Sequence, residues 1–196
     1  RAAAEQEMPR AQCNLAWCYE HGKGVEKNEK RALAWYQKAA DQGDPRGMYC
    51  VGRAYDYGRG TERDIKAAVG WYQKAAEAGS VSAMCDLGVC YERGEGVEQN
   101  LEKAVELYRR AAERGDATGQ CNLGHMYESG RGVAKDWVQA AKWYGAAAEQ
   151  GSPRAQYHLA WCYEHAAGVQ QDLTKALALY EAAAAQQYED AEKQVQ

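Results

Sequence analysis

Residues 44–79 read DPRGMYCVGRAYDYGRGTERDIKAAVGWYQKAAEAG, and this stretch decides the fold because the chain repeats its pattern every 36 residues. The pair Trp71-Tyr72 and the glycine Gly60 have a counterpart in each copy. The pairs are Trp35-Tyr36, Leu107-Tyr108, Trp143-Tyr144 and Leu179-Tyr180, and the glycines are Gly24, Gly96, Gly132 and Gly168. A fixed period of this length is typical of stacked repeats, so we expect an all-α solenoid.

Each copy carries the start and stop signals of two helices. Asp44 followed by Pro45 is a helix N-cap signal, and the first helix is expected to run to about Tyr57. Asp64 caps a second helix, which Gly79 ends. The caps of the other second helices are Asn28, Asn100, Asp136 and Asp172.

Both helices have an apolar face at helical spacing. On the first helix it comprises Gly47, Val51, Gly52 and Tyr55. On the second helix, in the first copy, it comprises Ala32, Trp35, Tyr36, Ala39 and Ala40. One helix pair cannot bury both of its faces alone, so neighbouring pairs are expected to stack.

The period gives a domain organisation without insertions. We expect residues 1–7 to be the tail of a preceding repeat and residues 8–187 to be five repeats: 8–43, 44–79, 80–115, 116–151 and 152–187. Residues 188–196 are either a polar capping helix or a truncated sixth repeat, with apolar positions at Ala191 and Val195. The first residue is Arg1, so the chain is expected to be cut from a longer protein.

Composition excludes several partner classes. The net charge of −4 with mixed signs does not favour nucleic acid, and no apolar run is long enough for membrane insertion. Most of the seven cysteines occupy two repeat positions: Cys13, Cys85 and Cys121 share one, and Cys18, Cys90 and Cys162 share the other. Equivalent positions in stacked repeats are roughly 10 Å apart, too far for a disulfide. We therefore expect free thiols, no disulfides and a cytoplasmic location.

Several short motifs resemble the Sel1-like (Sel-one-like) repeat family, a relative of tetratricopeptide repeats. They are the Leu-Gly pairs Leu87-Gly88 and Leu123-Gly124 and the Gly-Val pairs Gly24-Val25, Gly96-Val97, Gly132-Val133 and Gly168-Val169. The resemblance implies an α/α right-handed superhelix that serves as an adaptor, with the first helices lining a concave face. One branch of the family carries a disulfide cysteine at the end of the second helix. Here that position holds Ala40, Ala76, Ala112, Ala148 and Ala184, so nothing particular to that branch is carried over.

A variable stripe on the first helices is the candidate binding surface, because positions that face a ligand are free to differ between repeats. We predict a groove that binds an extended or helical peptide bearing carboxylates, since arginine and aromatic residues are common interface anchors. The candidate residues are Arg10, Asn14, Trp17, His21, Arg46, Arg53, Tyr57, Arg93, His125, Arg154, His158 and Trp161. In the alternative interpretation the stripe is a solvated surface, whose arginines are neutralised by Glu20, Asp56, Glu92, Glu128 and Glu164.

No catalytic or metal-binding pattern is present. His158 and His165 are about two helical turns apart, which is too far to share a metal ion. The glycine-rich segments follow helices and not strands, so they are turns and not phosphate-binding loops. We therefore expect no enzyme activity, no catalytic residues, no metal and no cofactor. The predicted function is a non-enzymatic adaptor or scaffold that binds another protein or a peptide. The alternative is a structural spacer or regulatory array within a larger protein, with no ligand of its own.

Overall fold

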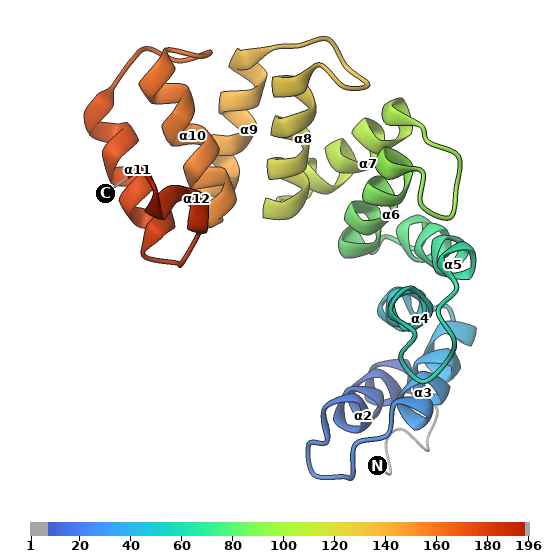
Figure 1. Cartoon of the computed structure of the whole chain (residues 1–196). Coiled ribbons are helices and arrows are strands. Elements are labelled where there is room, and N and C mark those ends of the chain that lie inside the picture. Colours follow the sequence, from blue (N-terminus) through green and yellow to red (C-terminus); the bar gives the residue numbers. More distant parts are fainter. Residues whose placement is uncertain (1–7, 195–196) are drawn as a thin grey trace. The chain divides into compact units, whose positions relative to one another are not determined.

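A computed structural model describes residues 8–194, and this part of the chain contains helices and no strands (Figure 1). The chain divides into two compact units, the first ending at Gln99 and the second beginning at Asn100. Unit 1 comprises α2 (Pro9–His21), α3 (Glu29–Asp41), α4 (Pro45–Tyr57), α5 (Ile65–Glu77) and α6 (Val81–Arg93). Unit 2 comprises α7 (Leu101–Glu113), α8 (Ala117–Ser129), α9 (Trp137–Glu149), α10 (Pro153–His165), α11 (Leu173–Ala184) and α12 (Glu189–Glu192).

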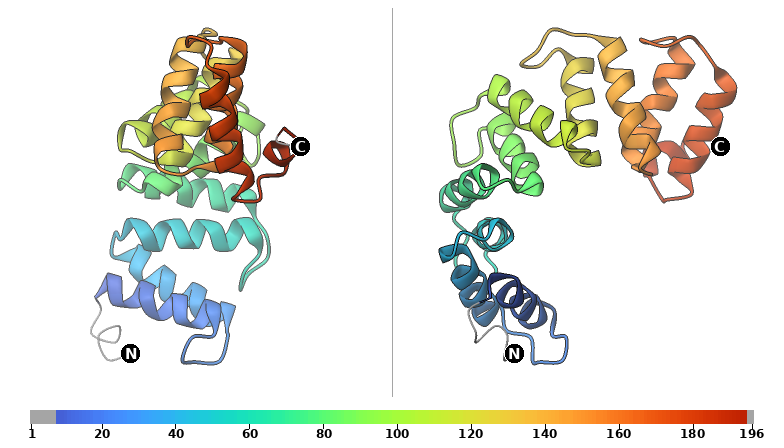
Figure 2. Two further views of the ribbon diagram at one scale, coloured as in Figure 1. Left: turned by 90° about the vertical axis from the view of Figure 1, so that its left-hand side faces the viewer. Right: turned by 180° about the vertical axis from the view of Figure 1, so that it is seen from behind.

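Consecutive helices pack against each other within each unit, as the two views of Figure 2 show. In unit 1, α3 packs against α2 and α4, and α5 packs against α4 and α6. In unit 2, α8 packs against α7 and α9, and α10 packs against α9 and α11. This arrangement confirms the expected fold class of stacked helix pairs.

The caps form as the sequence predicts. Asp64 Oδ1 accepts a hydrogen bond from the backbone N–H of Ala67 at 3.0 Å, and each of the other four second helices begins with the same type of bond. Gly58 ends α4 in the left-handed conformation, with φ of 66°. In the fifth repeat Ala166 replaces this glycine and still adopts φ of 55°, so the turn is retained with some backbone strain.

Close helix contact explains the glycine in the first helix. A Cβ atom added to Gly52 would lie 2.7 Å from the ring of Tyr72, and one added to Gly124 would lie 2.8 Å from the ring of Tyr144. Tyr72 and Tyr144 are fully buried. In these pairs the core therefore contains a tyrosine of the second helix packed directly against a glycine of the first.

All seven cysteines are free thiols, as expected, and five of them are buried. Burial raises the pKa of Cys13, Cys90 and Cys162 to about 12 and that of Cys50 to about 11. Because the thiolate is the reactive form, these side chains act as small apolar groups.

The structure describes only part of the two ends of the sequence. The expected repeat tail at residues 1–7 and the apolar residue Val195 lie outside the described residues. Ala191 lies within α12 and is fully buried.

Candidate peptide-binding site

The predicted stripe residues fall into two groups, one in each unit. Unit 1 holds Arg10, Asn14, Trp17, His21, Arg46, Arg53, Tyr57 and Arg93, and unit 2 holds His125, Arg154, His158 and Trp161. In unit 1 all but Arg53 are exposed, and in unit 2 all but Arg154 are half-buried.

A groove of about 730 Å³ in unit 1 contains four of the predicted residues. Trp17 and His21 come from the last turns of α2, and Arg46 and Arg53 come from α4. The groove is also lined by residues outside the predicted binding set, from α2, α3, α4, the loop after α4 and the start of α6, although Cys50 and Ser82 occupy positions of the variable stripe. These are Glu20, Tyr36, Pro45, Tyr49, Cys50, Arg59, Ser80 and Ser82.

Arg53 is held by aromatic rings rather than by a carboxylate. Its guanidinium carbon lies 5.9 Å from the ring centre of Tyr49 and 5.5 Å from that of Tyr57. Tyr49 is fixed in turn, because its hydroxyl donates a hydrogen bond to Asp86 Oδ2 at 3.0 Å. These cation–π contacts orient the guanidinium and leave its N–H groups available to an acceptor.

Arg46 is the second guanidinium of the groove. Its Nη1 donates a long hydrogen bond of 3.3 Å to the amide oxygen of Asn14. Over residues 8–194, neither Arg46 nor Arg53 forms an ion pair with a carboxylate. The groove therefore carries two arginines that form no ion pair with a carboxylate. Burial acts to lower the pKa of Arg53, but Tyr49, Tyr57 and the more distant Asp86 carboxylate raise it.

The acidic residues beside the stripe are engaged elsewhere. Glu20 Oε2 accepts a hydrogen bond of 2.8 Å from the Tyr36 hydroxyl, and Glu20 Oε1 pairs with Arg59 at 2.9 Å. Asp56 lies 3.9 Å from Arg63. Neither Arg59 nor Arg63 belongs to the stripe, so in unit 1 Glu20 and Asp56 do not neutralise Arg46 and Arg53.

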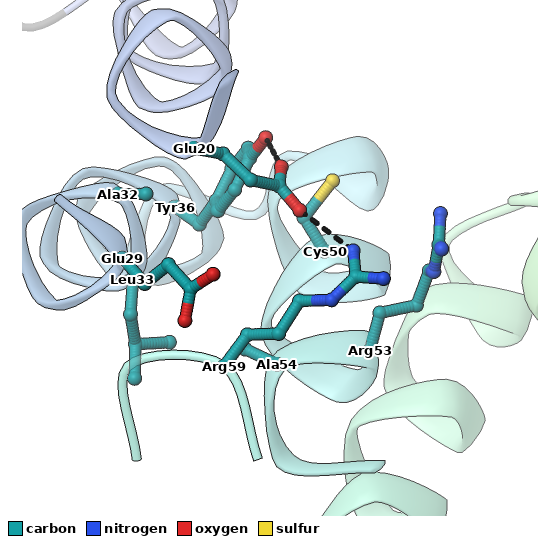
Figure 3. A pocket seen from close by; sticks show the side chains of 9 residues that line it. All are labelled: Glu20, Glu29, Ala32, Leu33, Tyr36, Cys50, Arg53, Ala54 and Arg59. Atoms are coloured by element: carbon teal, nitrogen blue, oxygen red, sulfur yellow. Dashed lines mark hydrogen bonds and ion pairs between the residues drawn. The ribbon is translucent and has the colours of Figure 1, made fainter. Parts of the chain in front are cut away.

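A small cavity of about 30 Å³ adjoins the groove (Figure 3). The two share Glu20, Tyr36, Cys50, Arg53 and Arg59 as lining residues. Figure 3 shows Glu20 between Tyr36 and Arg59, with the Arg53 side chain extending away from this pair. The Glu20–Arg59 ion pair thus lines both the small cavity and the groove.

Trp17 provides an exposed aromatic surface at the groove. Its side chain is 41% exposed, and the ring of His21 stacks on it with 4.6 Å between ring centres. His21 Nδ1 also lies 3.0 Å from the Trp17 carbonyl oxygen, which fixes the imidazole over the indole. A large apolar side chain exposed at a groove is typical of a protein-binding surface.

In unit 2 the positions equivalent to this part of unit 1 hold a cluster of histidine, tyrosine and glutamate side chains. Glu128 accepts a hydrogen bond from the Tyr144 hydroxyl, and its Oε2 lies 3.4 Å from His158 Nδ1 and 3.8 Å from His125 Nδ1. The His158 ring stacks on Tyr144 at 4.9 Å. Among residues 8–194 no group of three or more potential ligands could hold a metal ion.

Two other predicted residues of unit 2 have partners within the unit. Arg154 donates a hydrogen bond of 3.1 Å to Asn122, which repeats the Arg46–Asn14 contact of unit 1. Trp161 stacks between Trp137 and His165, at 5.1 Å and 4.3 Å between ring centres.

Four of the predicted residues in unit 1 do not line the groove. These are Arg10, Asn14, Tyr57 and Arg93. Arg93 lies 3.7 Å from the exposed Glu95, and Tyr57 reaches the site through its contacts with Arg53 and Arg59.

The sequence contains a signal for the contacts between neighbouring first helices. Asn14 and Arg46 are 32 residues apart, and so are Asn122 and Arg154, while His125 and His158 are 33 apart. These separations are one repeat less a helical turn, so they connect neighbouring slots on adjacent first helices. Complementary residues separated by 32 or 33 positions in the sequence therefore predict both the Asn–Arg contacts and the histidine cluster.

Comparison with known proteins agrees with this architecture. The fold defines the chain as an α-solenoid built from helix pairs, a class that binds partners on its surface. A model of the Sel1 repeat matches residues 9–44, 45–80, 81–116, 117–152 and 153–188. The chain therefore belongs to the Sel1 repeat family, as its sequence motifs predict, and members of this family are generally protein-interaction scaffolds and typically non-catalytic.

Two solved structures are similar over nearly the whole chain. A Sel1 repeat protein from Oxalobacter formigenes is 38% identical, with a TM-score of 0.91, over 97% of this chain and 76% of that one. The protective antigen c5321 of uropathogenic Escherichia coli, which has an SLR fold, is 37% identical with a TM-score of 0.89. That match covers 98% of this chain and 41% of the antigen, so this chain spans less than half of the antigen's length.

A shorter match comes from a curated protein, the chitin synthase regulator SKT5 of Saccharomyces cerevisiae. It is 49% identical over 37 residues, which is 19% of this chain and 5% of the yeast protein. The match has the length of about one repeat. In the part of the chain that the structure describes, no helix is both long and apolar enough to span a bilayer.

Proposed function

We propose that this chain is a binding module that holds an acidic peptide segment of a partner protein in the groove of unit 1. The observation that carries the proposal is the pair of groove arginines, Arg46 and Arg53, that form no ion pair with a carboxylate. Peptide carboxylates would supply such partners, and an arginine fork can bind a carboxylate through two hydrogen bonds.

The surroundings of the two arginines support a peptide rather than a free anion. Trp17 offers an exposed apolar platform, and Ser80 and Ser82, at the start of α6, bring hydroxyl groups to the groove. A peptide can use all three features at once, whereas a small anion would use only the guanidinium groups. The family's general role as a protein-interaction scaffold supports the same kind of partner.

The test uses fluorescently labelled 12-residue peptides in which glutamate alternates with alanine, and matched peptides in which glutamine replaces glutamate. Anisotropy titrations at low ionic strength should show binding of the glutamate peptide and little binding of the glutamine peptide. The affinity should fall as salt is raised, because exposed charges are screened.

The variant Arg46→Glu/Arg53→Glu should lose at least about tenfold in affinity, since each broken charge-assisted contact costs roughly 1.5–3 kcal/mol. A matched control is Lys30→Glu/Lys66→Glu, which makes the same change in net charge at exposed positions of α3 and α5 outside the groove lining. Equal loss in both variants would reduce the effect to net charge and contradict the proposed site. Binding of the glutamine peptide as tight as that of the glutamate peptide would exclude carboxylate recognition, and binding of neither peptide would favour a spacer role.

A further inference from the structure

Each junction between consecutive helix pairs is closed by a loop glycine. A Cβ atom added to Gly60 would lie 2.4 Å from the Glu29 carbonyl oxygen, and one added to Gly168 would lie 2.1 Å from that of Trp137. The corresponding glycines Gly96 and Gly132 approach Ile65 and Leu101 at 2.7 Å and 2.5 Å. The loop that follows each first helix thus covers the beginning of the preceding second helix.

At three of these four junctions the side chain four residues further along the second helix is buried, and at the first junction the equivalent Leu33 is half-buried. Val69 and Val105 are each 5% exposed, and Ala141 is 3% exposed. In α11 the equivalent residue is Leu177, and it is 51% exposed. Leu173, at the position of Ile65 and Leu101, is 62% exposed. The last second helix therefore presents an apolar face that the earlier junctions bury.

The short helix α12 follows the repeat register. It begins at Glu189, which is one period of 36 residues after Pro153, the first residue of α10. The turn before it contains Gln187 with φ of 61°, at the position where Gly151 has φ of 82°. Ala191 is fully buried, as is its equivalent Ala155.

Backbone hydrogen bonding supports the same register. The N–H of Tyr188 donates to the Ala183 carbonyl at 3.3 Å, just as the N–H of Ser152 donates to the Ala147 carbonyl at 3.2 Å. α12 packs against α11, beside the end of that helix (Figure 1). Its position is that of the first turn of a first helix.

From these observations we infer that the face of α11 formed by Leu173 and Leu177 is a docking surface for a sixth Sel1-type helix pair, of which α12 is the first turn. The new interface would continue the one that occurs at the junctions after α5 and α7, where Ile65 and Val69, and Leu101 and Val105, hold the positions of Leu173 and Leu177. The Oxalobacter and Escherichia relatives are each longer than this chain.

The inference is tested by extending the chain. Residues 1–188 are followed by a second copy of residues 153–188, so that the added helix pair continues from the position of α12. Hydrogen exchange of the α11 amides should become about tenfold slower or more in the extended chain, because their local opening would now expose a packed interface.

Two substitutions separate docking from a general effect of length. Leu177→Glu in the extended chain should abolish the added protection. Ala178→Glu is the matched control, because Glu106 and Lys142 already place charges at its equivalent positions, and it should leave the protection unchanged. In the unextended chain, neither substitution should slow or speed the exchange by more than about twofold, since both side chains are exposed.

Two results would overturn the inference. The first is an extended chain whose α11 exchanges as fast as in the parent, or in which both substitutions have the same effect. The second is a parent chain that dimerises in sedimentation experiments and becomes monomeric with Leu177→Glu, because the occupant would then be a second copy.

Discussion

The hydroxyl group of Tyr36 in α3 donates a hydrogen bond to Glu20 in the last turn of α2, at 2.8 Å and sixteen residues apart in sequence. The same bond joins Tyr72 to Asp56, Tyr144 to Glu128 and Tyr180 to Glu164. In each case a buried tyrosine from the second helix fixes a carboxylate of the first. In unit 1 this bond holds Glu20 at the groove, where it also pairs with Arg59.

We predict that Tyr36→Phe lowers the free energy of unfolding by about 1–2 kcal/mol, because the Glu20 carboxylate loses one of its two partners in a half-buried position. Urea denaturation would measure the loss. Tyr57→Phe is the control, since that ring is 58% exposed and its cation–π contacts do not need the hydroxyl. An equal loss in both variants would contradict a structural role for the Tyr36–Glu20 bond.

Two glycines in helices of unit 1 should respond in opposite ways to alanine. At Gly52 the new methyl group would lie 2.7 Å from the Tyr72 ring, so Gly52→Ala should destabilise the chain by about 1–3 kcal/mol. At Gly70 nothing lies within 4 Å of the new methyl group, so Gly70→Ala should stabilise it by about 0.5–1 kcal/mol through helix propensity. Thermal unfolding monitored by circular dichroism gives both signs, and a Gly52→Ala variant as stable as the parent would argue against the close helix contact.

These two glycines also illustrate what the sequence could predict about the fold. The repeat register identified Gly52 as a packing position, because glycine or alanine recurs there in all copies, and it identified the cap residue of every second helix. Such features repeat because each junction imposes the same steric requirement. Internal comparison therefore reached the fold without any knowledge of side-chain contacts.

The candidate site could be predicted only in part, because its contacts differ from one repeat to the next. Trp17, His21, Arg46 and Arg53 were identified as variable positions, and they do line one groove. The sequence does not predict the ion pair between Arg59 and Glu20, because it depends on where the loop after α4 lies. A comparison of residues 36 apart also does not relate His125 to His158, although both side chains lie beside Glu128.

Thiol reactivity provides a test of the cysteine environments. Because burial raises the pKa of Cys13, Cys90 and Cys162 to about 12, these groups are almost entirely protonated at pH 8. Ellman's reagent at this pH should label them at least about a hundredfold more slowly in the folded chain than in denaturant, where a cysteine pKa is near 8.5. All seven thiols should react in denaturant without reductant. A smaller number would reveal a disulfide and contradict the free-thiol assignment.

The last prediction concerns acid stability and the cluster around Glu128. Burial acts to raise the pKa of this carboxyl, but the neighbouring His125 and His158 side chains and the Tyr144 hydroxyl outweigh it and hold the pKa well below its usual value. A carboxyl whose pKa is lower in the folded state stabilises the fold above the pKa of the unfolded chain, near 4.3, and loses that contribution as the pH falls. The stability difference between the parent and Glu128→Gln should therefore be largest near pH 5 and shrink steadily toward pH 3.

Urea titrations of both proteins at pH 5, 4 and 3 measure this difference. We expect it to be about 1–3 kcal/mol at pH 5, because the charged acceptor and its hydrogen bonds are lost in the variant. Glu106→Gln, at an exposed position of α7, is the matched control and should show a difference near zero at each pH. If the Glu128→Gln difference stayed constant down to pH 3, protonation of Glu128 would not be the event that weakens unit 2 in acid.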